Sequence, residues 1–129
     1  MNAKELIGLA KTYVNLSNRH QLKLIEPMFM GDAIYQSAFF GEYKGRIAIH
    51  EMMVSFFARF SDAHWDVTEY RETNDQGVEF EFVMTATDAA SGERVERHGL
   101  ERIYFASDGL ISRITVSKPD EDNTINPFD

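Results

Sequence analysis

The stretches VEFEFVMTATD, residues 78–88, and RVERHGLERIYF, residues 94–105, decide the fold of this chain. Successive side chains of a strand point to opposite faces of a sheet. One face of the first stretch therefore carries Phe80, Phe82, Met84 and Ala86. One face of the second stretch carries Val95, Arg97, Gly99, Glu101, Ile103 and Phe105. The short turn at Ser91-Gly92 predicts that the two strands are antiparallel neighbours.

The mostly apolar face of the second strand carries one carboxylate, Glu101, between Gly99 and Ile103. Burial of an acid costs several kcal/mol unless the group is neutralised or paired. In an apolar pocket the pKa of Glu101 would rise, and its carboxyl group could donate or accept a proton near neutral pH. The alternative interpretation is a structural ion pair with Arg97, which shares the same face, or with Arg46.

Three helices are predicted before this pair of strands. Residues 3–19 carry apolar residues and Tyr13 at helical spacing, and residues 21–29 form a shorter helix that Pro27 ends or kinks. The third helix begins at Gly45. Its apolar stripe consists of Ile49, Met52, Met53, Phe56, Phe57 and Phe60. Core packing explains most of this stripe, although methionine and phenylalanine also suit the wall of an apolar ligand pocket.

Three further strands are expected, at Ala33–Ser37, at 64–71 and at 110–118. Short turn signals separate the last four strands of the chain, which makes them antiparallel neighbours. Helices that are followed by such a run of strands are typical of an α+β fold. We therefore expect about three helices packed on one face of a mostly antiparallel sheet.

The other face of the predicted sheet mixes apolar and hydrogen-bonding side chains. It carries Val83, Thr85, Leu100, Arg102, Tyr104, Ile111 and Arg113. Such a surface is typical of a protein interface, and the alternative is a solvated face with scattered apolar residues. A homodimer through this outer face is the expected assembly.

The composition argues against several classes of function. The chain has 129 residues and a formal net charge of -8, which disfavours nucleic acid and anionic membranes as partners. It has no cysteine, and its four histidines form no HxxH or HxxxH pair, so no metal site is predicted. No phosphate-binding loop or nucleophile elbow is present, so no cofactor is expected. Without a signal-peptide pattern or a membrane-spanning apolar run, a cytoplasmic protein is expected.

The length is that of one domain with one hydrophobic core. We expect this domain to cover residues 1–118. Residues 119–129 are acidic and contain two prolines, so an irregular tail is expected there. Its Phe128 could cap a neighbouring apolar opening.

Four segments carry a resemblance to a known superfamily. They are PMFMGDAIYQS (27–37), YKGRIAIHEMMVSFF (43–57), GVEFEFVMTAT (77–87) and HGLERIYFASDGLISRITV (98–116). In their order and spacing they resemble the nuclear transport factor 2-like superfamily, and within it the SnoaL-like and ketosteroid-isomerase-like members. The resemblance covers roughly residues 3–118. It implies a strongly curved sheet wrapped around the helices as a cone with an apolar pocket, and dimerisation through the outer sheet face.

The resemblance also implies roles for single residues. Ketosteroid isomerases use a tyrosine of the first helix, a carboxylate base after the first short strand, and a protonated acid on a later strand. Tyr13 matches the tyrosine, and Glu101 matches the strand acid. Ser37 stands at the position of the base, and serine is not a free-standing base, so true ketosteroid isomerase activity is not expected. The paired acids and arginine of limonene epoxide hydrolases are not evident either.

Two functions remain open from the sequence. The first is cofactor-free proton transfer on a small apolar, ring-shaped carbonyl compound, as in an isomerase, cyclase or dehydratase. Glu101 would move the proton and Tyr13 would steady the enolate oxygen. The expected pocket wall consists of Tyr35, Ser37, Met53, Phe56, Trp65, Phe80, Phe82 and Met84. The second function is a non-catalytic small-molecule-binding or accessory domain of the same fold, which the absence of a base at Ser37 favours.

Overall fold

The computed structural model describes residues 1–119, which form three α-helices, one 3-10 helix and seven strands. The helices are α1 (Ala3–Asn18), α2 (Leu22–Ile25), the 3-10 helix η1 (Glu26–Met28) and α3 (Arg46–Arg59). The strands are β1 (Phe29–Ser37), β2 (Gly41–Lys44), β3 (His64–Asp66), β4 (Tyr70–Glu72), β5 (Gly77–Thr87), β6 (Arg94–Phe105) and β7 (Ile111–Ser117). Beyond Pro119 the predicted acidic tail, with Phe128, lies outside the described residues.

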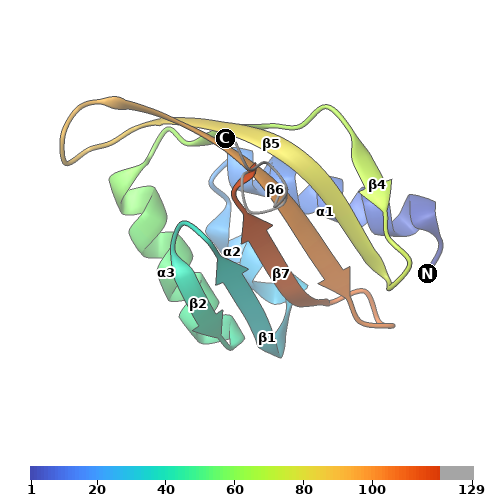
Figure 1. Cartoon of the computed structure of the whole chain (residues 1–129). Coiled ribbons are helices and arrows are strands. Elements are labelled where there is room, and N and C mark those ends of the chain that lie inside the picture. The colour runs from blue at the N-terminus through green and yellow to red at the C-terminus, as the bar shows by residue number, and fades with distance from the viewer. Residues whose placement is uncertain (120–129) are drawn as a thin grey trace.

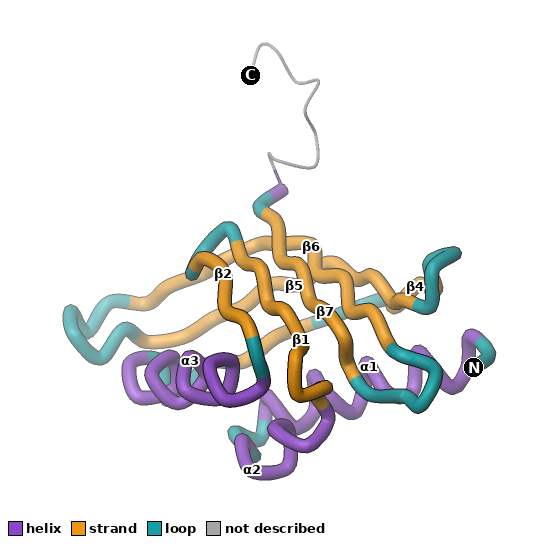
Figure 2. The backbone as a smooth tube through the Cα atoms, turned by 90° about the horizontal axis from the view of Figure 1, so that it is seen from below, coloured by secondary structure: helices purple, strands orange, loops and turns teal. Residues whose placement is uncertain are grey.

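All seven strands belong to one sheet, in the order β2-β1-β7-β6-β5-β3, with β4 also paired to β5. β1 and β7 are parallel, and the other pairs are antiparallel. The helices lie on one face of the sheet, and the long strands β5 and β6 arch over them (Figures 1 and 2). This arrangement confirms the predicted α+β fold with a mostly antiparallel sheet.

The first helix is fixed at both ends. At its start, the Asn2 side chain accepts a hydrogen bond from Glu5 N at 2.8 Å, and the Glu5 side chain accepts one from Asn2 N at 3.0 Å. This reciprocal pair satisfies two backbone donors that the helix itself leaves free. At its end, the Asn18 side chain donates to the carbonyl oxygen of Trp65 at 3.0 Å and accepts from Trp65 N at 2.8 Å. The C-terminal end of α1 is thereby tied to β3.

The central ladder pairs β5 with β6 from Gly77–Tyr104 to Thr87–Arg94. On the face toward the helices, the buried residues of β5 are Val78, Phe80, Phe82, Met84 and Ala86. Ile103 and Phe105 of β6 are buried on the same side. The alternation expected from the sequence is therefore confirmed, and these side chains form the middle of the hydrophobic core.

Several element boundaries differ from the sequence expectation. The strand expected at 64–71 consists of two short strands, β3 and β4, which pair with different parts of β5. The second helix ends at Ile25 and continues as a 3-10 helix, because Pro27 cannot donate the next helical hydrogen bond. The sequence gives no sign of β2, since its GEYK segment has three exposed residues and no apolar alternation.

Ile111 lies inside the core, so its placement on the outer face is wrong. Tyr104 pairs with Arg113, but the next residue, Phe105, pairs with Ile111, which leaves Ser112 as an extra residue in β7. Such a bulge reverses the side-chain alternation on one side of it. Ile111 is therefore 0% exposed, and the Ser112 hydroxyl donates to the carbonyl oxygen of Tyr104 at 3.1 Å.

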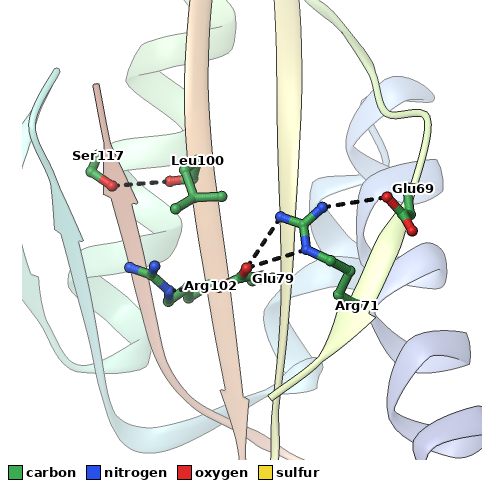
Figure 3. A network of polar contacts seen from close by, with 6 residues as sticks. All are labelled: Glu69, Arg71, Glu79, Leu100, Arg102 and Ser117. Carbon is green, nitrogen blue, oxygen red and sulfur yellow. Dashed lines mark hydrogen bonds and ion pairs between the residues drawn. The ribbon is translucent and has the colours of Figure 1, made fainter. Parts of the chain in front are cut away.

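A carboxylate links three strands on the outer face of the sheet (Figure 3). Glu79 Oε2 accepts hydrogen bonds from Arg71 Nη2 at 3.1 Å and Nε at 3.2 Å, and Glu79 Oε1 accepts one from Arg102 Nε at 3.0 Å. Arg71 also forms an ion pair with Glu69 at 3.6 Å. Partial burial raises the pKa of Glu79, but the two arginines outweigh that effect and leave the pKa below its ordinary value. Glu79 is therefore ionised at neutral pH and joins β4, β5 and β6.

The homodimer through this outer face stays a prediction. Val83 and Tyr104 are half-buried on the face, whereas Leu100 is only 7% exposed in the single chain and has little area left to bury. We expect sedimentation equilibrium to show a concentration-dependent dimer that Val83→Lys shifts toward monomer, because the new charge would lose water in the contact. The control is Val54→Lys, because Val54 is 49% exposed and belongs to α3, a helix on the opposite face of the sheet. A monomer at every concentration would contradict the prediction.

Candidate functional site

Two small adjoining cavities lie between the inner face of the sheet and helices α1 and α3. Their volumes are about 40 Å³ and about 30 Å³. The residues that line both are Tyr35, Phe40, Phe56, Trp65 and Glu101. Tyr13 from α1 and Met53 from α3 line the first cavity, and Arg97 lines the second. Glu101 therefore stands where the two cavities meet, within walls that are otherwise mostly apolar.

Glu101 is a buried acid without a polar partner. It is 5% exposed, and its Oε2 atom makes no hydrogen bond to any residue of the described chain. It lies on the central ladder opposite Phe80. Loss of contact with water raises the pKa of Glu101 to about 8, because the charged form is the one that burial disfavours. At neutral pH its carboxyl group is mostly protonated, yet ionisation remains within reach.

The ion pair that was the alternative explanation for Glu101 does not form. Neither Arg97 nor Arg46 pairs with Glu101 among the residues that the structure describes. The residue between Arg97 and Glu101 on this face is Gly99, and a Cβ atom there would lie 2.5 Å from the ring of Phe82. The Phe82 ring thus lies directly on the glycine that separates Arg97 from Glu101 along this face of β6.

Two buried tyrosines share the first cavity with Glu101. Tyr13 is 6% exposed and Tyr35 is 9% exposed. Burial raises the pKa of both phenols well above the ordinary value, and the nearby Glu101 raises each further. Burial and Glu101 also raise the pKa of the half-buried Tyr70 to about 12. The phenols therefore keep their protons and are available as hydrogen-bond donors at neutral pH.

Aromatic rings from α3, β3 and the turn after β1 form much of the cavity wall. The Phe56 ring lies 5.7 Å from the Trp65 ring and 5.2 Å from the Phe40 ring, measured between centroids. The Phe57 ring lies 5.9 Å from Trp65. Met52 and Met53 of α3 complete this side. Methionine side chains change rotamer easily, so this wall is the part of the cavity best suited to move.

The structure brings most of the expected site residues together. Of those expected, Tyr13, Tyr35, Met53, Phe56, Trp65 and Glu101 line the first cavity, and Phe82 and Met84 line the second. Phe80 lines neither cavity, because it is 0% exposed and packs against Tyr70 with ring centroids 4.9 Å apart. Ser37 also lies outside both cavities. Its Oγ atom accepts hydrogen bonds from Phe39 N at 3.0 Å and Phe40 N at 3.2 Å, so it shapes the turn after β1.

Several lining residues were not expected as part of the site. Met52 and Phe57 belong to the apolar stripe of α3, so helical spacing alone could have identified them. Arg97 has the same strand parity as Glu101, which could have placed it on the wall rather than in an ion pair. Phe40 lies in the turn between β1 and β2, where no periodicity reveals the direction of a side chain. The other unexpected lining residues are Val14, Ser17, Phe39 and Val116.

Two further features are absent among the described residues, a metal-ligating cluster and a membrane-spanning helix. Within residues 1–119, no group of three histidine, aspartate or glutamate side chains could hold a metal ion. In the same part of the chain, no helix has the length and apolar character that crossing a membrane requires. The polar side chains that line the two cavities are those of Glu101, Tyr13, Tyr35, Arg97, Ser17 and Trp65, and the rest of the lining is apolar.

The sequence also matches a known protein family. The sequence profile of the SnoaL-like domain matches residues 10–114. The chain belongs to the SnoaL-like family. The match confirms the resemblance to this branch of the nuclear transport factor 2-like superfamily. No curated protein sequence matches the chain.

Several solved structures of other proteins share the fold. The epoxide hydrolase/cyclase-like enzyme SalBIII, which has a role in pyran ring formation in the polyether salinomycin, aligns with a TM-score of 0.83 and 16% identity over 94% of this chain and 95% of its own. A proposed polyketide cyclase from Xanthomonas campestris pv. campestris aligns with a TM-score of 0.80 and 17% identity over 95% of this chain and 96% of its own. The third structure is a hypothetical protein with a ketosteroid isomerase-like fold from Catenulispora acidiphila, solved in complex with trimethylamine. It aligns with a TM-score of 0.75 and 14% identity over 84% of this chain and 82% of its own. At these identities the likeness establishes the cone-shaped fold.

Replacement of Gly99 by alanine tests the contact that separates Arg97 from Glu101. The new methyl group would meet the Phe82 ring at 2.5 Å, so the buried ring has to move. We expect Gly99→Ala to lower the free energy of unfolding by about 1–3 kcal/mol in urea denaturation. The control is Gly31→Ala in β1, where a Cβ atom meets nothing within 4 Å and the change should stay within about 0.5 kcal/mol. Equal stability of the two variants would show that the contact is unimportant.

Replacement of Glu101 by glutamine tests the raised pKa. From about pH 5 to pH 8 the folded wild-type protein holds a proton on Glu101 that the unfolded chain has lost, so its free energy of unfolding falls as the pH rises. The slope approaches about 1.4 kcal/mol per pH unit. The glutamine side chain has the shape of the protonated acid but does not titrate. The free energy of unfolding of Glu101→Gln, relative to that of the wild type, should therefore rise as the pH rises across the same range. Urea denaturation at several pH values measures the difference, with the exposed Glu81→Gln as the control. A difference that does not vary with pH would contradict the prediction.

Proposed function

We propose that this SnoaL-like protein binds a small apolar carbonyl compound between the sheet and α3 and catalyses cofactor-free proton transfer on it. The observation that carries the proposal is the buried, unpaired carboxyl group of Glu101, with a pKa of about 8, beside Tyr13 and Tyr35. An acid whose pKa lies near the working pH is suited to accept and return a proton. The reaction would be of the isomerase, cyclase or dehydratase type.

The chemistry follows from the protonation states of the three groups. Roughly a tenth of the Glu101 carboxyl groups are ionised at pH 7. The carboxylate accepts a proton from the carbon next to the carbonyl group. The electron pair of that C–H bond forms the C=C bond of the enolate, and the π electron pair of the C=O bond moves to the oxygen. Tyr13 or Tyr35 donates a hydrogen bond to the enolate oxygen that forms. Glu101 then returns the proton to a carbon of the same molecule, and no oxidant or cofactor is consumed.

Binding requires the cavity to widen. A cavity of about 40 Å³ has room for little more than water, whereas ligand sites usually enclose ~300–1,000 Å³. Met52, Met53 and Phe57 on α3 form the movable wall, and rotation of their side chains would admit a flat ring beside Trp65. The small resting volume favours a ligand of one or two rings.

A non-catalytic binding domain is the second candidate. Ser37, at the position of the base in ketosteroid isomerases, is held in a turn outside both cavities. Glu101 is therefore the one carboxyl group among the residues that line the two described cavities. A single acid that must both take and return the proton is a weaker catalyst than an acid and base pair. SalBIII is named as an epoxide hydrolase/cyclase-like enzyme, and this supports the catalytic proposal for a chain of the same fold.

Hydrogen–deuterium exchange of 2-indanone in D₂O tests the proposal. The protein should accelerate exchange of the protons beside the carbonyl group, as followed by NMR and corrected for the rate without protein. The rate should rise with pH and level off above about pH 8, because ionised Glu101 is the base. Glu101→Gln should lower the rate by about 10²-fold or more, whereas Glu81→Gln on the outer face should not.

The indole resonance of Trp65 distinguishes the two candidates. Trp65 is the one tryptophan of the chain and lines both cavities, so its side-chain N–H signal reports ligand binding. A shift of this signal by 2-indanone without faster exchange would favour the binding domain. The absence of both effects would reject the cavity as a site for carbonyl compounds.

A further inference from the structure

We propose that Arg97 is the anion-binding end of this site, so that the ligand carries a carboxylate at one end of its ring and an enolisable carbonyl group at the other. The inference rests on the proposed function, since it assigns the second polar contact of the same ligand. Arg97 would bind and orient the ligand, while Glu101 would perform the proton transfer.

The first observation is a pair of unpartnered polar atoms on one cavity wall. Among the described residues, Arg97 Nη1 and Glu101 Oε2 are the buried side-chain atoms that lack a hydrogen-bond partner. Both residues line the second cavity. Buried polar groups without partners are rare in folded proteins, because each loses its hydrogen bonds to water. Two such groups facing one space indicate that a bound molecule supplies the missing partners.

The second observation is the way in which Arg97 is held. Its guanidinium carbon lies 5.3 Å from the Phe39 ring centroid, 5.2 Å from Phe40 and 5.3 Å from Phe60. Aromatic rings stabilise a guanidinium through its charge but do not accept hydrogen bonds from the N–H groups in its plane. The planar group is therefore fixed in position with an N–H group unused. A carboxylate, which can accept two parallel hydrogen bonds, matches it best.

The third observation is the charge at this end of the site. Asp88 is the carboxylate whose charge acts on the pKa of Arg97. Asp88 is already paired with another arginine, because it accepts hydrogen bonds from Arg59 Nε at 2.9 Å and Nη2 at 2.7 Å. The charges that act on Arg97 are those of Arg59 and Asp88. With Arg97 itself, two cations face one carboxylate that is already paired, so the Arg97 end favours an anion.

Strand geometry sets the size of the ligand. Arg97 and Glu101 are four residues apart on β6, which corresponds to roughly 13 Å between their Cα atoms. The ring of Phe82, which lies on Gly99 between them, forms an apolar floor. A ring-shaped ligand that rests on this floor can place one end at Arg97 and the other at Glu101. We therefore assign the substrate class as a small ring-containing keto acid.

A matched pair of probes tests the inference. Indane-2-carboxylate and 2-indanone have the same ring system. The first carries a carboxylate at the ring position where the second carries a neutral ketone. Titrations at pH 7, followed by the Trp65 indole resonance, should show that the wild-type protein binds the carboxylate at least about tenfold more tightly than the ketone. This comparison needs no variant. Equal affinity for the two probes, or no shift with either, would overturn the inference.

Variants of the arginine identify the contact. In Arg97→Met the affinity for indane-2-carboxylate should fall by about tenfold or more, while the affinity for 2-indanone stays within about twofold. Arg97→Lys keeps the charge without the planar pair of donors and should give an intermediate value. The control is Arg94→Met on the same strand, where the side chain is 62% exposed and pairs with Asp62. A carboxylate preference that persists in Arg97→Met would place the anion elsewhere and overturn the assignment.

The two proposals fail in distinguishable ways. If the protein binds the carboxylate through Arg97 but does not accelerate exchange of 2-indanone, the anion site stands and the catalytic proposal fails. If exchange depends on Glu101 but the carboxylate preference is absent, catalysis stands and the role of Arg97 is rejected. Far-ultraviolet circular dichroism of each variant verifies that a loss of binding does not reflect a loss of fold.

Discussion

The pairing of β5 with β6 is the constraint on which the site depends. Its register places Gly99 opposite Phe82 and Glu101 opposite Phe80. Because the side-chain period of a strand is two residues, a shift of one residue would turn Glu101 and Arg97 to the outer face. The turn between the strands and the apolar face that must be buried together fix this register. The inward direction of the acid is thus a consequence of the core, and no local feature around Glu101 is needed to produce it.

Much of this arrangement can be predicted from the sequence, because the alternation of residues along a strand indicates the sheet face on which each side chain lies as well as the presence of the strand. The parity of Glu101 correctly placed it inside, among Phe82, Met84 and Ile103. Parity could not decide whether Arg97 reaches Glu101. That outcome depends on the ring of Phe82 over Gly99, which is a contact between two strands and leaves no periodic signal in either.

Errors of the sequence interpretation have similar physical causes. Ile111 was placed on the wrong face, because Ser112 adds one residue to β7 at a point that its sequence does not mark. Ser37 was expected at the pocket, whereas its hydroxyl group is used by the backbone of the following turn. In both cases the deciding interaction is a hydrogen bond between groups whose pairing the local pattern does not encode.

The parallel pairing of β1 with β7 has a consequence for the synthesis of the chain. Residues 29–37 lie beside residues 111–117, so β1 stays next to an empty position in the sheet until nearly the whole described chain has left the ribosome. In the unfolded chain Glu101 is in contact with water and is therefore ionised at neutral pH. β7 contributes Val116 to the wall of the second cavity, and burial in the folded protein raises the pKa of Glu101 to about 8, so Glu101 takes up a proton on folding. Maturation of this protein is therefore accompanied by proton uptake from its surroundings.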